Sequence, residues 1–340
     1  MARTVTFGEI MMRLNPEGYR RIVQADRFEA SYAGGEANVA VSLAQYGEEA
    51  SFVSRIPAHE VGQACVNELR RYGVGTADIV RGGDRLGLYF VEKGASQRAS
   101  KVIYDRAGSA IALAKRSDFD WEKIFRGTDW FHWTGITPAL GRELPQICLD
   151  ACQEAKRQGV TISCDLNYRK KLWSRESARE TMEKLVPYVD LCIANEEDAS
   201  DVFGIRAENT DIESGTLSKE GYISVAQQIH ERYGCGRVAI TLRSSLSATI
   251  NKWAGMFFNG ESACFSREYT IHIVDRVGGG DSFGGALIYS QLHGYDPQKA
   301  IEFAVAASCL KHTIEHDFNL VSVAEVTALA EGSGSGRVQR

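Results

Sequence analysis

Hydrophobic and polar residues follow two alternating patterns along most of the chain, short β-rich runs and longer stretches with helical spacing. The first run, over residues 5–8, reads as a strand. A helix is then predicted over 37–46, where Val39, Leu43 and Tyr46 recur at the spacing of one helical face. Strands that alternate with helices predict an α/β fold, a sheet with helices on both of its faces.

The same alternation continues through most of the remaining chain, and no internal repeat interrupts it. Further strands are expected over 51–54, 129–135, 161–167, 190–195 and 237–242, with several β-like runs between 247 and 273. Further helices are expected over 62–72, 143–158, 178–186, 223–233, 282–293 and 297–313.

One region departs from the alternation, because LGLYFVEK and SKVIYD read as two strands with only the polar GASQRA between them. Strands without an intervening helix predict a small separate sheet beside the main one. The Gly/Ser-rich end of the chain is expected to be disordered. The predicted organisation is an α/β core over 1–10, 34–74 and 107–330, a β lid over 11–33 and 75–106, and a disordered tail over 331–340.

Composition narrows the classes of function. The 340 residues carry 39 basic and 44 acidic side chains, a formal net charge of -5 that argues against a duplex nucleic-acid binder. No run approaches the roughly 18–20 apolar residues of a membrane span, and the N-terminus lacks the apolar centre of a secretory signal. The eight cysteines form no C-x-x-C pair, so they are expected to be reduced core thiols. We therefore expect a cytoplasmic protein with small-molecule partners, and neither a nucleic acid nor a membrane among them.

The densest chemical signal is EYTIHIVDRVGGGDSFGGALIYSQL, where a strand runs into three glycines, an aspartate and a long apolar helix. Helix N-termini carry unpaired backbone N–H groups and a partial positive charge, and glycines let an anion approach the backbone. The loop therefore predicts phosphate binding. It is not a Walker A loop, because Gly284 is followed by glycine and not lysine, and Phe283 stands where a dinucleotide fingerprint needs its third glycine.

Asp281 is the unusual member of this loop, since a carboxylate should repel the phosphate that the glycines attract. A carboxylate beside a γ-phosphate can accept the proton of an attacking alcohol, which is general-base catalysis of phosphoryl transfer. The competing interpretation is that Asp281 only caps the helix. The residues of the loop alone do not decide between the two.

The segment DRVGGGDSFGG resembles the second signature of the PfkB, or ribokinase-like, carbohydrate kinases, D-T-x-G-A-G-D. The first Asp and the final G-x-G-D match, while Arg276 replaces the usual Thr and Gly279 the usual Ala. The resemblance implies a ribokinase-like three-layer αβα core with a small β-sheet lid, and ATP and Mg²⁺ as cofactors. It also implies that Asp281 is the catalytic base, and that the anion hole is formed by the amides of Gly278, Gly279 and Gly280.

A second segment, YAGGEANVAVSLAQYG, is similar to the first signature of the same family. Gly34, Gly35 and Asn38 match the positions that hold sugar hydroxyls. The competing interpretation is a tight turn whose glycines serve packing alone. The resemblance, which spans about residues 3–330, also implies that the lid closes over the sugar and forms the contact of a homodimer.

Two weaker motif matches indicate the residues that would contact the nucleotide. ANEEDA resembles the family pattern N-x-x-E, which orders Mg²⁺ and phosphates. Asn195 matches the Asn, and Asp198 stands in place of the Glu. Glu196 is able to act on the metal through water. Its alternative is an acidic first turn that complements the helix dipole. TLRSSLSATI resembles the nucleotide-contacting T-x-G, with Thr241 matching and Arg243 in place of the glycine. Gly278 and Gly280 complete the implied nucleotide contacts.

Two arginines indicate a sugar acid, because a guanidinium can hold a carboxylate with two hydrogen bonds. Tyr104 and Arg106 lie in IYDRAGSA, and Arg169 lies in DLNYRKKLW. Both segments resemble the 2-keto-3-deoxygluconate kinases of this family, which show Y-x-R-x-x-S-A and D-x-N-x-R-x-x-L-W, and Tyr89 sits where that subfamily contacts substrate. The alternative for either arginine is a surface ion pair.

One further motif points elsewhere. HTIEH matches H-x-x-E-H, in which His312 and His316 on one helical face would serve a metalloprotease. The prediction that best joins the motifs is an ATP-dependent kinase that phosphorylates the terminal hydroxyl of 2-keto-3-deoxygluconate. Its alternatives are a fructokinase or ribokinase, the metalloprotease, and a non-catalytic sugar-binding homologue. A monovalent-cation cofactor and the preference between gluconate- and galactonate-derived acids stay open.

Overall fold

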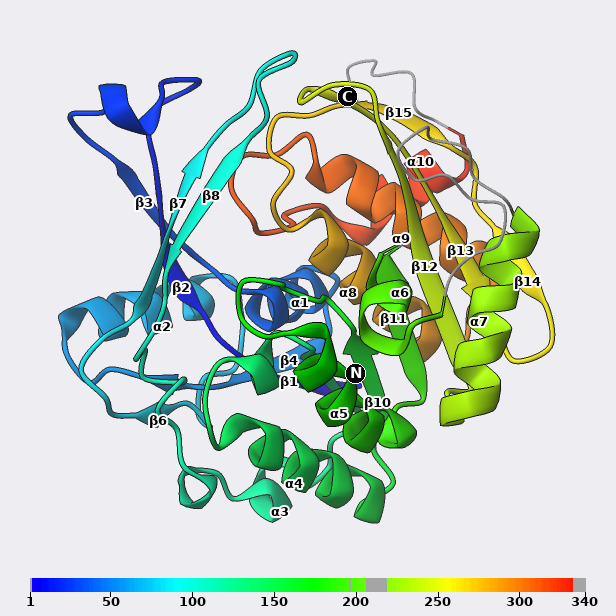
Figure 1. Cartoon of the computed structure of the whole chain (residues 1–340), viewed down its shortest axis with the longest axis horizontal. Coiled ribbons are helices and arrows are strands. Elements are labelled where there is room, and N and C mark those ends of the chain that lie inside the picture. Colours follow the sequence, from blue (N-terminus) through cyan, green and yellow to red (C-terminus); the bar gives the residue numbers. More distant parts are fainter. Residues whose placement is uncertain (1, 196, 206–218, 333–340) are drawn as a thin grey trace.

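A nine-stranded sheet forms the centre of the computed structural model, which describes residues 2–195, 197–205 and 219–332 (Figure 1). From β4 to β12 neighbouring strands are parallel, and three antiparallel strands extend the sheet beyond β12. The order is β14-β13-β12-β11-β10-β9-β1-β4, and β15 also pairs with β13. The strands are β1 (Arg3–Phe7), β4 (Glu49–Val53), β9 (Trp130–Thr134), β10 (Thr161–Asp165), β11 (Leu191–Asn195), β12 (Arg237–Ser245), β13 (Ile250–Phe258), β14 (Ala263–Phe265) and β15 (Tyr269–His272).

Successive side chains of the central strands enter two separate hydrophobic clusters, one on each face of the sheet. Phe131 and Trp133 of β9 pack into one cluster, and Trp130 packs into the other. The first cluster is covered by α3 (Trp121–Ile124), α4 (Leu144–Arg157), α5 (Arg175–Leu185), α6 (Asp198–Phe203) and α7 (Lys219–Tyr233). The second is covered by α1 (Gly35–Gln45), α2 (Glu60–Arg71), α8 (Gly279–Leu292), α9 (Pro297–Lys311) and α10 (Val323–Ala330). The predicted three-layer αβα core is confirmed.

A smaller sheet stands apart from the core in Figure 1, in the order β3-β2-β7-β8. Its middle strands β2 and β7 are parallel, and both outer pairs are antiparallel. The strands are β2 (Met11–Asn15), β3 (Glu29–Ala33), β7 (Gly87–Glu92) and β8 (Lys101–Asp105). All four fall within 11–33 and 75–106, although β6 (Val80–Arg81) in the second segment pairs with β5 (Arg55–Ile56) of the core. The predicted small lid sheet is confirmed.

The last two helices show how local signals set helix ends. The side chain of Asp296 accepts a hydrogen bond from the amide of Lys299, and Pro297 opens α9. The sequence analysis did not predict α10, although Ser322 and Glu325 form a capping box at its start.

Among the described residues, no helix combines the length and apolarity needed to cross a bilayer. All eight cysteines are free thiols, and six of them are buried.

The start of α1 is anchored by a buried carboxyl group. Glu36 is 2% exposed and accepts hydrogen bonds from the Thr134 amide (3.1 Å), the Thr134 hydroxyl (2.8 Å) and the Thr137 hydroxyl (2.5 Å). These bonds tie the glycine-rich entry of α1 to the end of β9. Burial is the dominant influence on this group and raises the pKa of Glu36 to about 7, although the three hydrogen bonds act in the opposite direction.

Glu36→Gln should therefore weaken the pH dependence of stability. The pKa of Glu36 is raised from 4.5 to about 7 in the folded protein. The protonated group therefore contributes stability that is fully present below pH 4.5 and is lost as the pH rises through 7. The wild type should lose about 3 kcal/mol more unfolding free energy than Glu36→Gln between pH 4.5 and pH 8. Urea unfolding at both pH values measures this difference, and the exposed lid variant Glu17→Gln is the control. If Glu36→Gln and the wild type lose the same unfolding free energy between the two pH values, the prediction is wrong.

Candidate active site

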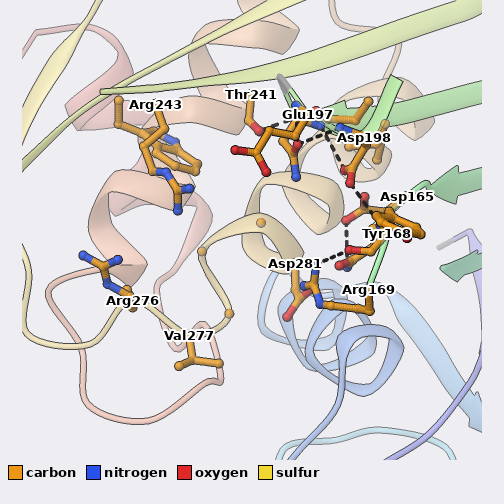
Figure 2. A pocket seen from close by; sticks show the side chains of 18 of the residues that line it. Asp165, Tyr168, Arg169, Glu197, Asp198, Thr241, Arg243, Arg276, Val277 and Asp281 are labelled. Carbon is orange, nitrogen blue, oxygen red and sulfur yellow. Dashed lines mark hydrogen bonds between the residues drawn. The ribbon is translucent and has the colours of Figure 1, made fainter. Parts of the chain in front are cut away.

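Two cavities meet at the N-terminus of α8. The larger, of about 410 Å³, lies at the carboxyl ends of β10, β11 and β12, where ligands of α/β sheets bind. The smaller, of about 80 Å³, lies between the lid and the start of α1. Both are lined by Asn167, Arg169, Val277 and Asp281, so these four residues form a shared wall. Figure 2 shows Arg169 and Asp281 side by side in this wall. The arrangement suits two ligands that react with each other at Asp281.

The glycine loop before α8 is shaped by close backbone contacts. Gly278 has φ +84°, and a Cβ at this position would lie 2.1 Å from the carbonyl oxygen of Asp317. A Cβ on Gly279 would lie 2.4 Å from the ring of His312, whereas a Cβ on Gly280 would meet no atom within 4 Å. Amides in the first turn of a helix have no intrahelical acceptor and attract anions. Gly278 and Gly279 are thus required by packing, while Gly280 leaves open space in the larger cavity.

Asp281 is the third residue of α8 and does not cap this helix. The N-cap of α8 is Gly278, which makes no side-chain capping bond. The Asp281 carboxylate instead accepts a 2.6 Å hydrogen bond from the side-chain amide of Asn38. Burial raises the pKa of Asp281 to about 6, and Asp317 adds to this effect, while Asn38, Arg169 and Lys311 lower it. A carboxylate with this pKa is mostly ionised at pH 7 and basic enough to accept a proton from an alcohol.

The first signature lies in the smaller cavity, which is lined by Gly34, Gly35 and Asn38. A Cβ on Gly34 would lie 1.8 Å from the carbonyl oxygen of Glu9, so close packing requires a glycine at this position. Gly34 is nevertheless partly exposed where it lines the smaller cavity. Asn38 links α1 to α8, because its amide donates to Asp281 and its side-chain oxygen accepts from the Gly34 amide at 3.3 Å.

The other four residues expected to contact the sugar also line the smaller cavity: Tyr89, Tyr104, Arg106 and Arg169. Arg169 is exposed. Arg106 is paired with Glu9, to which its Nε donates at 2.7 Å and one terminal nitrogen also donates. Glu9 is 2% exposed, and the sequence analysis missed it because 97 residues separate it from Arg106. Arg106 therefore presents a guanidinium that is already oriented by a buried carboxylate.

The larger cavity collects the residues expected on the nucleotide side: Asn195, Asp198, Thr241, Arg243, Gly278 and Gly280. The side-chain oxygen of Asn195 accepts from the amides of Glu197 (2.8 Å) and Asp198 (3.0 Å), as at a helix N-terminus. Asp198 accepts from the amides of Tyr168 (3.0 Å) and Asn195 (3.2 Å). Glu196 lies outside the described residues. Figure 2 shows Arg243 and Arg276 across the cavity from Asp198.

Three of the carboxylates that line the larger cavity, those of Asp165, Asp198 and Asp281, have raised pKa values. Burial, and then the charges of Asp198 and Asp281, raise the pKa of Asp165 well above its ordinary value. Burial also raises the pKa of Asp198 to about 6. Such mutual repulsion fits a cavity that receives a divalent cation, and Mg²⁺ commonly takes only one or two protein carboxylates beside phosphate oxygens. Asp165 is the last residue of β10, and its position at the carboxyl end of a parallel strand is the sequence signal that could have placed it in the cavity.

The HTIEH segment is not a metalloprotease site. Helix α9 ends at Lys311, so His312 and His316 do not share a helical face. The His312 ring bonds the Ser308 carbonyl oxygen (2.6 Å), and His316 has φ +63° with its ring 3.1 Å from Glu29. Within 2–195, 197–205 and 219–332, no three His, Cys, Asp or Glu side chains converge on a metal position. The H-x-x-E-H match is a coincidence of sequence.

The fold and the site define a carbohydrate kinase: residues 1–315 match the pfkB family carbohydrate kinases, and the chain belongs to this family. It is 53% identical to a 2-dehydro-3-deoxygluconokinase from Thermotoga maritima, whose crystal structure superposes with a TM-score of 0.94 over 97% of this chain and 98% of that one. It is 33% identical to a 2-dehydro-3-deoxygalactonokinase from Haloferax volcanii over 98% of each chain. The resemblance predicted from the motifs is confirmed.

A more distant structure bears on the cofactors. A putative ribokinase II from E. coli, solved with ATP and Mg²⁺, superposes with a TM-score of 0.81 over 97% of this chain and 99% of that one. At 18% identity it shares the fold. ATP and Mg²⁺ are therefore bound by a protein of this architecture.

Gly280→Val should separate anion binding from folding. Its side chain has open space in the fold but projects beside the first-turn amides, so kcat/KM for ATP should fall by at least about tenfold with little change in Tm. Gly284→Ala, one turn further along α8 and in ordinary contact with Ile193, is the matched control for helix propensity. Gly278→Ala should instead destabilise the fold. A Gly280→Val enzyme with normal kcat/KM for ATP would contradict the assignment of the anion hole.

Proposed function

We propose that the protein is an ATP-dependent kinase that phosphorylates the terminal hydroxyl of 2-keto-3-deoxygluconate, which is the same compound as 2-dehydro-3-deoxygluconate. The observation that carries the proposal is the placement of Asp281 in the wall shared by the two cavities. The names of the Thermotoga and Haloferax relatives support the substrate class.

Asp281 is the proposed general base. Its carboxylate accepts the proton of the terminal hydroxyl, and the hydroxyl oxygen forms a bond to the γ-phosphorus of ATP while the bond to the β–γ bridging oxygen breaks. The amides of Gly278, Gly279 and Gly280 stabilise the negative charge on the transferred phosphoryl group. The products are the phosphorylated sugar acid and ADP.

The larger cavity is proposed to hold the nucleotide, with Asn195, Thr241 and Arg243 among its contacts. Asp198, together with Glu196 through water, is proposed to hold Mg²⁺, which would neutralise part of the phosphate charge. Arg243 and Arg276 lie across from the carboxylates, where they can offset the remaining phosphate charge.

The smaller cavity is proposed to hold the sugar acid, with Gly34, Gly35 and Asn38 at its hydroxyls. Arg169 and Arg106 would bind its carboxylate, supported by Tyr89 and Tyr104, whose rings stack 5.9 Å apart. A fructokinase or ribokinase would use the same arginines on hydroxyl or phosphate groups. The gluconate- and galactonate-derived acids differ by one hydroxyl configuration, and the two named relatives represent both.

The lid over 11–33 and 75–106 is proposed to close over the sugar and to form the contact of a homodimer in the cytoplasm. Its outer strands and loops expose apolar side chains, among them Val23 (85%), Phe28 (37%) and Ile103 (52%). Sedimentation velocity measures the oligomeric state, and a monomer mass at assay concentrations would exclude this contact.

The function is tested by coupled ADP release with 2-keto-3-deoxygluconate, its galactonate-derived epimer, fructose, ribose and adenosine. Asp281→Asn should lower kcat on the order of 10²–10⁴ while ATP affinity changes little, because a positioned base acts on the transition state. The exposed lid variant Asp26→Asn is the control. The wild-type rate should also fall as pH drops through about 6, where Asp281 becomes protonated. If no sugar is turned over, the non-catalytic sugar-binding homologue is the remaining alternative. A near-normal kcat in Asp281→Asn would exclude Asp281 as the general base.

Arg169→Ala should cost roughly 1.5–3 kcal/mol of substrate stabilisation for the sugar acid and little for a neutral sugar of similar length. Arg169→Lys should recover only part of the loss, because an ammonium lacks the two-point geometry of a guanidinium. Lys171→Ala removes a charge from the same loop without lining the smaller cavity, and so controls for long-range charge. The measurement is kcat/KM for both sugars. Equal losses on the two substrates would favour the fructokinase alternative.

A further inference from the structure

Lys311 is a fully buried lysine that lines neither of the two cavities. It closes α9, and its ammonium donates to three main-chain carbonyl oxygens, those of Asp275 (3.3 Å), Ile314 (3.4 Å) and His316 (2.5 Å). Asp275 begins the loop that contains the three glycines, and the other two acceptors lie in the loop that follows α9. The ammonium is therefore enclosed by the two loops and joins them.

The same two loops contact each other along their backbones. The amides of Val274 and Asp275 donate to the His312 carbonyl oxygen at 2.8 and 3.2 Å. Further along, Gly278 packs directly against the backbone of Asp317, so that even a Cβ would not fit between them. A displacement of the loop after α9 would thus be transmitted to Gly278 and to the amides of the anion hole.

The charges around Lys311 balance. Asp275 and Asp317 each form a 2.5 Å ion pair with the buried guanidinium of Arg13. With Lys311 the group holds two positive and two negative side chains, all of them buried. Burial lowers the pKa of Lys311 and the charge of Arg13 adds to this effect, while the charges of Asp275, Asp317 and Asp281 act in the opposite direction. Without the ammonium, one negative charge would be uncompensated beneath a loop that binds an anion.

We propose that Lys311 is a positioning residue whose ammonium acts as a built-in monovalent cation for the phosphate-binding loop. It holds the main chain at Asp275 and compensates the charge beneath the anion hole, and so makes an added monovalent cation unnecessary. Backbone carbonyl oxygens that converge on one positive charge bind K⁺ or ammonium in the same way that they bind a lysine. Shortening the side chain should therefore create a site for such an ion. The proposal rests on the proposed kinase function, since its main readout is phosphoryl transfer.

The test compares the wild type, Lys311→Ala and Lys311→Met in tetramethylammonium, Na⁺, K⁺ or NH₄⁺ chloride at one ionic strength. The wild-type rate should be the same in all four salts. Lys311→Ala should lose kcat on the order of 10–100-fold in tetramethylammonium, the range for lost hydrogen bonds to a charged group, and recover much of it in K⁺ or NH₄⁺. Lys311→Met fills the space without charge, so it should lose activity and show no recovery. Lys252→Ala, on the exposed part of β13, is the control lysine.

Two further measurements distinguish a failure of this proposal from a folding defect and from a failure of the proposed kinase function. Lys311→Gln retains hydrogen-bond donors without the charge, so it should fold, as judged by circular dichroism, and raise KM for ATP. Sugar binding measured by calorimetry without ATP should be retained in every folded variant, which tests whether the smaller cavity is still formed. Wild-type turnover tests the kinase function itself, independently of Lys311. The proposal is overturned by a wild type that K⁺ stimulates, by full activity of Lys311→Ala in tetramethylammonium, or by folded Lys311→Ala that no monovalent cation reactivates.

Discussion

A buried guanidinium joins the lid to the loop before α8 and to the loop after α9. Arg13 belongs to the lid strand β2 and is fully buried, yet it contacts Asp275 before the glycine loop and Asp317 after α9. Tyr89 of β7 donates to the second oxygen of Asp317 at 2.8 Å, so a second lid strand joins the same group. Breaking a buried pair of this kind leaves an uncompensated charge, which is costly. The position of the lid over the smaller cavity and the shape of the anion hole therefore depend on the same interaction.

The cavities on either side of this junction differ in charge in a way that suits their proposed ligands. The larger cavity, proposed to hold the nucleotide, contains Asp165 and Asp198, whose mutual repulsion a divalent cation would relieve, with Arg243 and Arg276 opposite them. The smaller cavity, proposed to hold the sugar acid, presents Arg106, whose orientation is set by a buried glutamate. Asp281 lies between them with its pKa raised to about 6, because it is partly removed from water and also close to other charges. Burial thus raises the pKa of all three aspartates, and the charges beside each of them differ.

The local parts of this arrangement could be predicted from the sequence, and the long-range parts could not. The alternation of strands and helices and the glycine loop at α8 are encoded within short segments, so periodicity and motif spacing were sufficient. The partners of Arg13 are 262 and 304 residues away, and no local pattern identifies them. The HTIEH motif misled because its helix ends one residue before the first histidine. The capping box of α10 was a readable signal that was overlooked.

The shared wall has a thermodynamic consequence. Asn167, Arg169, Val277 and Asp281 face both cavities, so a ligand that orders them on one side changes the surface that the other ligand meets. Binding free energies are path-independent, and the factor by which the sugar alters the affinity for nucleotide must equal the factor by which the nucleotide alters the affinity for sugar. Any preference for binding the sugar or the nucleotide first then reflects the rates of binding and not the equilibrium affinities. At equilibrium the two ligands are reciprocal effectors, coupled through four side chains.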